Sequence, residues 1–134
     1  MLVYSASDLA WGVRVKSTAE ALGLPARPVR TLQMLEDRLA DSPVRALVVD
    51  LDHEDQDLSL GLIRRVAREN TRPAAAKADN PHAPTRPRIR ILAFSPHVHR
   101  ELMQHARDAG ADEVLPRGAF AANLPEILLK LSAE

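Results

Sequence analysis

Cysteine is absent from this chain of 134 residues, and aromatic side chains make up only 3% of it. The first absence excludes a disulfide framework and a thiolate metal site, although it does not by itself identify the compartment. The second means that the core must be built from Leu, Val, Ile and Ala. The sequence also lacks an 18-residue apolar run and a basic segment followed by a long apolar one at its start. We therefore expect neither a membrane span nor a signal peptide, and cytoplasmic is the default localisation.

The charge is balanced, with 18 lysine and arginine residues against 18 acidic residues. A neutral total argues against nucleic-acid binding driven by net charge. Positive charge nevertheless gathers between Asn70 and Arg90, where Asp79 is the one acid beside Arg72, Lys77, Arg86, Arg88 and Arg90. We expect a solvated loop there, and the alternative is a docking surface for an acidic partner. This stretch has no aromatic residue, so binding to single-stranded nucleic acid is not favoured.

Short apolar runs alternate with helical patterns along the chain, which predicts βαβ units in one α/β domain spanning 1–134. Five strands are expected, at Met1–Tyr4, Pro25–Val29, Ala46–Val49, Ile89–Phe94 and Glu113–Leu115. The two prolines of the second run would interrupt a central strand, so that run is placed at an edge. The continuous apolar third run is typical of a strand covered on both faces. The predicted fold is flavodoxin-like: a doubly wound parallel sheet with strand order 2-1-3-4-5.

Five helices are expected after these strands, in strict alternation. Residues that cap or end helices mark their boundaries: Ser7 or Asp8, Gly23, Thr31, Ser42-Pro43, Ser95-Pro96, Gly110 and Asn123. Apolar residues at helical spacing are expected to face the core: Trp11, Val15, Ala19, Leu22; Leu32, Leu35, Leu39; Leu58, Leu62, Ile63, Val66; Val98, Leu102, Ala106; Leu124, Ile127, Leu128 and Leu131. A Pro/Ala/Arg-rich loop insertion is expected at about 70–88, because no periodic apolar pattern runs through it.

The carboxyl ends of the strands are where a doubly wound fold places its ligands and chemistry. The residues expected there are Ser5, Ala6, Asp50, Ser95, Pro96, Pro116 and Arg117.

Three local matches make the chain similar to the receiver domains of bacterial response regulators, from Met1 to Leu131. Ala46–Asp50 resembles the apolar third strand that ends in the phospho-accepting aspartate. Ile91–Ser95 resembles the fourth strand, which ends in the Ser/Thr switch residue. Ala109–Leu115 is similar to the stretch that leads into the fifth strand. The resemblance implies a signalling module of two-component systems, with no enzymatic activity of its own.

In the family that the chain resembles, phosphoryl transfer to the aspartate needs Mg²⁺, which an acidic pair after the first strand helps to hold. A lysine after the fifth strand binds a phosphoryl oxygen. Here Ser5 and Ala6 stand at the acidic-pair positions and carry no carboxylate. Arg117 stands at the lysine position, with Pro116 before it instead of after it, and Glu54 stands where the family has a proline. Arginine keeps the charge but differs from lysine in shape and reach.

These departures indicate a degenerate receiver, or pseudo-receiver: a stand-alone module without a cofactor, in which Mg²⁺-dependent phosphorylation is lost or much weakened. Asp50 would then be an inactive acceptor position. Asp50 and Asp52, with Glu54, are weak candidates for a rebuilt acidic metal site. The alternative is a working phospho-receiver that uses Asp50 as acceptor, Ser95 as switch and Arg117 as counter-charge. By resemblance, a signalling partner or a second copy would bind through three segments: Val98–Ala109, Glu113–Leu115 and Asn123–Leu131.

A small enzyme or ligand-binding domain on the same fold is the alternative from another class. The sequence has no nucleophile elbow or Walker loop, and residues 5–8 contain no glycine. Ser5 and Ser7 leave open a phosphate-bearing ligand such as FMN. His97, His99 and His105, even with Glu101, are interpreted as surface residues and not as metal ligands.

Overall fold

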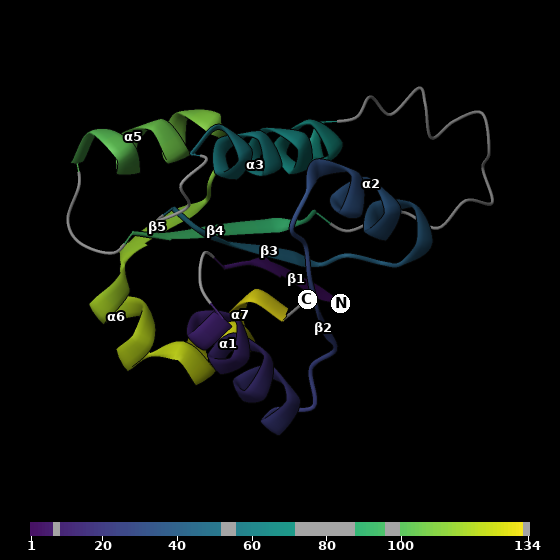
Figure 1. Ribbon diagram of the computed structural model, residues 1–134, viewed down its shortest axis with the longest axis vertical. Helices are drawn as coiled ribbons and strands as arrows, with labels where there is room; N and C mark the ends of the chain where they lie inside the picture. Colours follow the sequence, from purple (N-terminus) through teal and green to yellow (C-terminus); the bar gives the residue numbers. More distant parts are fainter. Residues whose placement is uncertain (7–8, 52–55, 72–87, 96–99, 133–134) are drawn as a thin grey trace.

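Five parallel strands form the centre of the computed structural model, which describes residues 1–6, 9–51, 56–71, 88–95 and 100–132. The strands are β1 (Leu2–Ser5), β2 (Ala26–Pro28), β3 (Ala46–Asp50), β4 (Arg90–Ser95) and β5 (Glu113–Pro116). Their order is β2-β1-β3-β4-β5, and every neighbouring pair runs parallel. The predicted doubly wound α/β fold and its strand order are confirmed, including the placement of the proline-containing strand at an edge (Figure 1).

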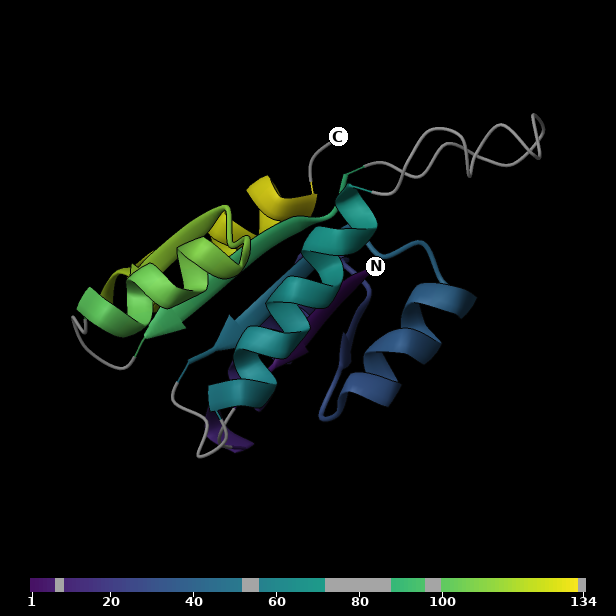
Figure 2. The same cartoon turned by 90° about the horizontal axis from the view of Figure 1, so that it is seen from above.

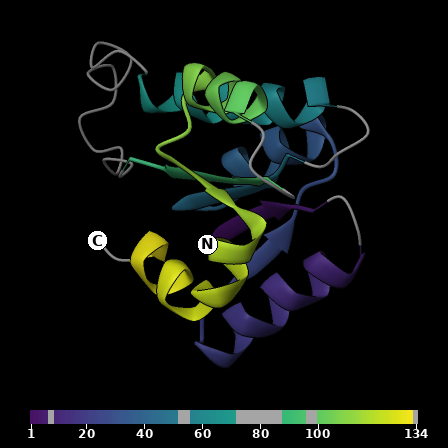
Figure 3. The ribbon, with the colours of Figure 1, turned by 90° about the vertical axis from the view of Figure 1, so that its left-hand side faces the viewer.

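Helices cover both faces of the sheet. They are α1 (Leu9–Ala21), α2 (Leu32–Asp41), α3 (Gln56–Asn70), α5 (Arg100–Ala109), α6 (Arg117–Ala122) and α7 (Leu124–Ser132). Helices α2, α3 and α5 lie side by side on one face (Figure 2), and α1, α6 and α7 lie on the other (Figure 3). Within the described ranges, no helix has both the length and the apolar character needed to cross a bilayer.

The core consists of two layers that share β3. Side chains alternate between the two faces of a strand, so Leu47 and Val49 pack on the α2/α3/α5 side, while Ala46 and Val48 pack on the α1/α7 side. Every residue of β3 is buried. This explains why its sequence is a continuous apolar run instead of an alternating one.

The helix boundaries follow from the residues expected to set them. Thr31 caps α2, and its hydroxyl accepts a hydrogen bond from the Met34 N–H at 3.1 Å. Gly23 ends α1 in the left-handed region with a φ of 72°, while the Leu24 N–H donates to the carbonyl of Ala19 at 2.8 Å. Thr31 and Gly23 therefore act as predicted.

Several expectations need correction. The predicted strict alternation of strands and helices is wrong, because two helices, α6 and α7, follow β5. Helix α6 is too short to show a periodic apolar pattern, and one fully buried side chain, Phe120, anchors it. Leu32 does not face the core and is 43% exposed, because it opens α2 at the rim of the helix layer. Ser95 does not begin a helix but ends β4, paired with Pro116 of β5. Expectations for Ser7, Asp8, Pro96, Val98 and the 72–87 part of the loop insertion fall outside the described residues.

Hydrogen bonds from side chains fix the amino-terminal ends of β4 and β5. The Asn70 amide group donates to the Ile89 carbonyl at 2.8 Å, and the Ile89 N–H donates back to the Asn70 side chain at 2.7 Å. The Asp112 carboxylate accepts from the Ile91 N–H at 2.8 Å and pairs with Arg88. The aspartate of the 109–115 motif thus has a structural role in aligning the start of β5 with β4.

Position 110 requires glycine for two reasons: its backbone conformation, and the lack of room for a β-carbon beside α3. Its φ is 123°, and a β-carbon added there would lie 2.6 Å from the β-carbon of Ala67 in α3. We expect Gly110→Ala to lower the free energy of unfolding by about 2 to 4 kcal/mol, from backbone strain together with overpacking. The measurement is urea denaturation followed by circular dichroism.

Gly61→Ala is the matched control, because Gly61 lies inside α3 and has no neighbour within 4 Å of an added β-carbon. It should raise the stability by about 0.5 to 1 kcal/mol, through helix propensity alone. Equal effects of the two substitutions would contradict the contact between Gly110 and α3.

Candidate functional site

The carboxyl edge of the sheet brings the predicted site residues together. Ser5 ends β1 and pairs in register with Val49, next to Asp50 at the end of β3. Asp50 pairs with Phe94, and Ser95 follows at the end of β4. Because parallel strands end at the same edge, residues distant in sequence become neighbours here.

Asp50 is the one charged residue among the fully buried side chains of the described residues, with an exposed fraction of 0%. Ser5 and Ser95 beside it are also buried. The main chain at Asp50 is fixed as well: its carbonyl accepts a hydrogen bond from the Ser59 hydroxyl at 3.2 Å, and the Leu51 N–H donates to the Phe94 carbonyl at 2.9 Å. The carboxylate is therefore held within the edge and is not presented to solvent.

The alternation of side chains assigns each edge residue to a face of the sheet. Asp50 follows Ala46 and Val48 by steps of two, so it faces the α1/α7 side, as Phe94 does. Ser5 and Ser95 follow Val3 and Ala93 respectively, which face the α2/α3/α5 side. The acceptor position thus shares its side of the sheet with the aromatic residues of the chain.

Three of the few aromatic rings form a cluster on that side. Phe94 of β4 stacks on Phe120 of α6, with ring centroids 4.3 Å apart and ring planes 3° from parallel. Trp11 of α1 packs against both, at 5.4 Å from Phe94 and 6.0 Å from Phe120. The cluster joins α1, β4 and α6 next to the end of β3. Sequence reasoning missed it, because the three residues are far apart in the chain.

Arg117, at the expected lysine position, opens α6 directly after β5. Its guanidinium carbon lies 5.3 Å from the centre of the Trp11 ring, within the range of a cation–π contact. Arg14 of α1 places its own guanidinium carbon 5.2 Å from the same ring. The guanidinium of Arg117, at the carboxyl edge of the sheet, therefore packs against the aromatic cluster.

Among the described residues of this edge, the donor set does not fit a magnesium ion. Ser5 offers a hydroxyl, Ala6 offers a methyl group, and Asp50 is fully buried, whereas Mg²⁺ prefers carboxylates among its oxygen ligands. Across the described ranges, no group of three His, Cys, Asp or Glu side chains could hold a metal. Asp52 and Glu54 fall outside those ranges, so their part in a rebuilt site stays a prediction.

Of the three histidines that follow β4 in the sequence, His105 lies in a described part of the chain. His97 and His99 lie outside the described residues. The ring of His105 lies 4.0 Å from the Glu101 carboxylate, one turn away on the exposed face of α5. That position is what the surface interpretation predicts for His105.

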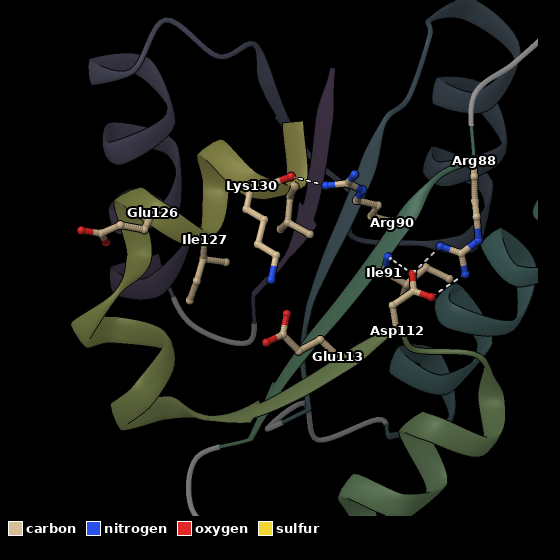
Figure 4. A pocket seen from close by; sticks show the side chains of 9 residues that line it. Arg88, Arg90, Ile91, Asp112, Glu113, Glu126, Ile127 and Lys130 are labelled. Carbon is tan, nitrogen blue, oxygen red and sulfur yellow. Dashed lines mark hydrogen bonds and ion pairs between the residues drawn. The ribbon is translucent and has the colours of Figure 1, made fainter. Parts of the chain in front are cut away.

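A pocket of about 560 Å³ lies at the opposite, amino-terminal end of the sheet, between β4, β5 and α7 (Figure 4). Apolar Ile127 and Leu131 of α7 form part of its wall. Its charged residues are Arg88, Arg90 and Lys130 against Asp112, Glu113 and Glu126. The Arg90 guanidinium donates to the main-chain carbonyl of Lys130 and so connects β4 to α7. The sequence gives no sign of this pocket, although the part of its wall that comes from β5 and α7 belongs to two of the segments predicted to bind a partner.

The fold of the chain is similar to solved structures of response regulators. No family model and no curated protein matches the chain. Among solved structures it is similar to a response regulator from Thermotoga maritima, with 20% identity, a TM-score of 0.70, and coverage of 97% of this chain and 94% of that one. For the chemotaxis response regulator CheY4 of Vibrio cholerae the identity is 11%, the TM-score 0.69, and the coverage 97% and 96%. For the beryllofluoride-activated NtrC4 receiver domain dimer the identity is 14%, the TM-score is 0.63, and the match covers 98% of this chain and 98% of that one. The chain has the fold of receiver domains.

Phe120 is expected to hold α6 against the sheet. Phe120→Ala should lower the free energy of unfolding by about 3 to 5 kcal/mol, because a fully buried ring that stacks on Phe94 is replaced by a cavity. The measurement is urea denaturation. Leu129→Ala in α7, where the side chain is 49% exposed, is the control and should change stability by less than about 0.5 kcal/mol. A similarly small loss for Phe120→Ala would contradict the packing of α6.

Proposed function

We propose that this chain is a receiver-like signalling module that acts by contact with another protein, and that its Mg²⁺-dependent aspartyl phosphorylation is lost or much weakened. The proposal combines the fold of response-regulator receivers with a carboxyl edge of different chemistry. One domain spanning 1–134, with an insertion at about 70–88, would form the module. Its output would come from binding and not from catalysis.

The observation that carries the proposal is the environment of Asp50. A carboxylate accepts a phosphoryl group only if a donor can approach one of its oxygens with the negative charge neutralised. Asp50 is fully buried, and the end of β1 supplies Ser5 and Ala6 instead of two carboxylates. Arg117, the nearby cation by sequence position, lies against Trp11. Each of these features disfavours phosphoryl transfer.

A phospho-accepting receiver with an altered site is the second candidate. It is favoured by the retention of Asp50 and Ser95 at the ends of adjacent strands, where the resemblance requires an acceptor and a switch residue. Arg117 would then serve as the counter-charge. The two candidates share a fold and differ only in whether Asp50 reacts.

The partner surface in this proposal comprises α5, the open edge strand β5 and α7. The pocket beside β5 and α7 carries equal numbers of acidic and basic side chains around apolar Ile127 and Leu131. A surface with both signs of charge suits a partner that is itself mixed in charge, and it suits a second copy of the chain because an isologous contact pairs each residue with its complement. The similar NtrC4 receiver domain is a dimer.

Phosphorylation can be tested by intact mass after incubation with acetyl phosphate and Mg²⁺. We expect no phosphoryl adduct on the wild-type protein under conditions that fully modify a conventional receiver, because Ser5 and Ala6 at the end of β1 offer the metal no carboxylate beside the buried Asp50. The same experiment on Asp50→Ala should give the same unmodified mass.

An adduct on the wild-type protein that disappears in Asp50→Ala would overturn the loss of phosphorylation and favour the second candidate. Asp37→Ala, which removes an exposed carboxylate of α2, is the control for modification elsewhere. An adduct that survives in Asp50→Ala but not in Asp37→Ala would be surface chemistry, and it would leave the proposal standing.

A further inference from the structure

The two edge strands of the sheet differ in what their main chains offer to a further strand. In a parallel ladder, every second residue points both its N–H and its C=O toward the same neighbouring strand, and the residues between point the other way. One hydrogen bond therefore identifies the outward-facing residues of each edge strand. An edge with intact outward N–H groups can accept another strand, and proteins often block such an edge with proline.

Proline blocks the outer edge of β2. The Leu2 N–H donates to the Pro25 carbonyl at 2.9 Å, so Pro25 faces β1. By the alternation, Pro28, three residues further on, faces outward. Pro28 has no N–H, so the outer edge of β2 lacks a donor at that position.

The outer edge of β5 keeps its donors. The Asp112 N–H donates to the Ile91 carbonyl of β4 at 2.8 Å. Pro116, four residues further on, faces β4 as well, so its missing N–H interrupts the inner ladder and not the outer edge. Glu113 and Leu115 face outward, and on that side no other described residue hydrogen-bonds to their main chains. Figure 3 looks onto this edge and shows no described helix or strand across it.

The pocket between β4, β5 and α7 lies beside the same edge. The side chains of Glu113 and Leu115 are on the α7 side of the sheet, because Leu115 packs on that core layer. Glu113 lines the pocket, and half-buried Ile127 of α7 extends the apolar surface of Leu115 along its wall. The Lys130 side chain points toward Glu113 (Figure 4), but Glu113 forms no ion pair with a described residue.

We propose that β5 accepts an extended segment of a partner protein as an added strand, with a basic side chain opposite Glu113 and an apolar one opposite Leu115. Main-chain hydrogen bonds to the outward groups of these two residues supply affinity, and the two side chains supply selectivity. Residues directly opposite on neighbouring strands have β-carbons about 5 Å apart, so the charge of Glu113 selects its neighbour. The partner segment therefore carries a basic residue two positions from an apolar one.

Charge complementarity favours a different protein over a second copy of this chain. Two copies of β5 that pair symmetrically, each through both outward residues, set Glu113 of one copy against Leu115 of the other. An acid then faces an apolar side chain at two places, and neither Glu113 gains a cation. This inference rests on the proposed function and deepens it, because it names the kind of partner segment that the surface of β5 and α7 binds.

The test is an NMR titration of the wild-type protein with the end-blocked peptide Thr-Leu-Val-Lys-Val-Leu-Thr, which fits β5 in either strand direction. We expect the amide protons of Glu113 and Leu115 to move downfield and to exchange more slowly with solvent, because each gains a hydrogen bond. The amide proton of Val114 faces β4 and should stay protected throughout, and that of Ala26, at the blocked edge, should not respond. Unchanged amide protons of Glu113 and Leu115 would overturn the proposal.

A second peptide, with glutamate in place of the lysine, tests the charge. The wild-type protein should bind the lysine peptide more tightly by about two- to thirty-fold, and Glu113→Lys should reverse that preference. Glu126→Lys is the matched control, because it makes the same charge change at the pocket with a side chain that points away from Glu113 (Figure 4). It should keep the preference for lysine. Equal affinities of the two peptides for the wild-type protein would overturn the role of Glu113.

The main-chain contact has its own pair of variants. Leu115→Pro removes an outward N–H and should abolish binding of the lysine peptide, whereas Leu115→Ala keeps the N–H and should only weaken binding. Equal binding by the two variants would contradict strand addition. The wild-type amide readout stands even if Leu115→Pro does not fold.

The titration also distinguishes the occupants and the two proposals. Amide shifts of Glu113 and Leu115 that change with protein concentration, without peptide, would identify a second copy as the occupant and overturn the partner segment. All samples lack magnesium and acetyl phosphate, so failure of the peptide to bind would leave the absence of a phosphoryl adduct unaffected. An adduct on Asp50 would end the proposed loss of phosphorylation and leave the amide readouts interpretable.

Discussion

The burial of β3 on both faces is the constraint on which the other features depend. All five of its residues are buried, with Leu47 and Val49 packed on one helix layer and Ala46 and Val48 on the other. A slip of one residue would exchange the two faces, so the pattern of apolar volume sets the register with β1 and β4. That register places Asp50 opposite Phe94 and on the side of Trp11. The chemistry of the edge is therefore set by the packing of the core.

A fold can be kept while its site changes, because core and site make different demands on the sequence. The core demands apolar residues at fixed positions, which this chain supplies with few aromatic rings. Phosphoryl transfer would demand carboxylates at the end of β1, where Ser5 and Ala6 stand. Three of the four aromatic rings of the chain, those of Trp11, Phe94 and Phe120, pack together at this edge and join helices α1 and α6 to the sheet.

Features set by local sequence were predictable, and features set by tertiary packing were not. Strand order, the edge position of β2, the Thr31 cap and the Gly23 stop follow from apolar runs, prolines and capping residues. Helix α6 has six residues and a single fully buried anchor, Phe120, too little for a periodic signal. The positions of Asp50, Ser95 and Arg117 at one edge were predictable from topology. The contact of Arg117 with Trp11 was not predictable, because the two residues lie 106 positions apart in the chain.

The central claim is that this chain has the fold of a receiver, but that the carboxyl edge of its sheet does not bind magnesium. The most direct test is a magnesium titration followed by the NMR shifts of the backbone amides. The wild-type protein and the variant that combines Ser5→Asp with Ala6→Asp would be compared. The account predicts no saturable change at the ends of β1 and β3 in the wild-type protein, and a saturable one in the variant, because two carboxylates complete the set of oxygen ligands. Saturable binding of magnesium by the wild-type protein that Asp50→Ala abolishes would contradict it.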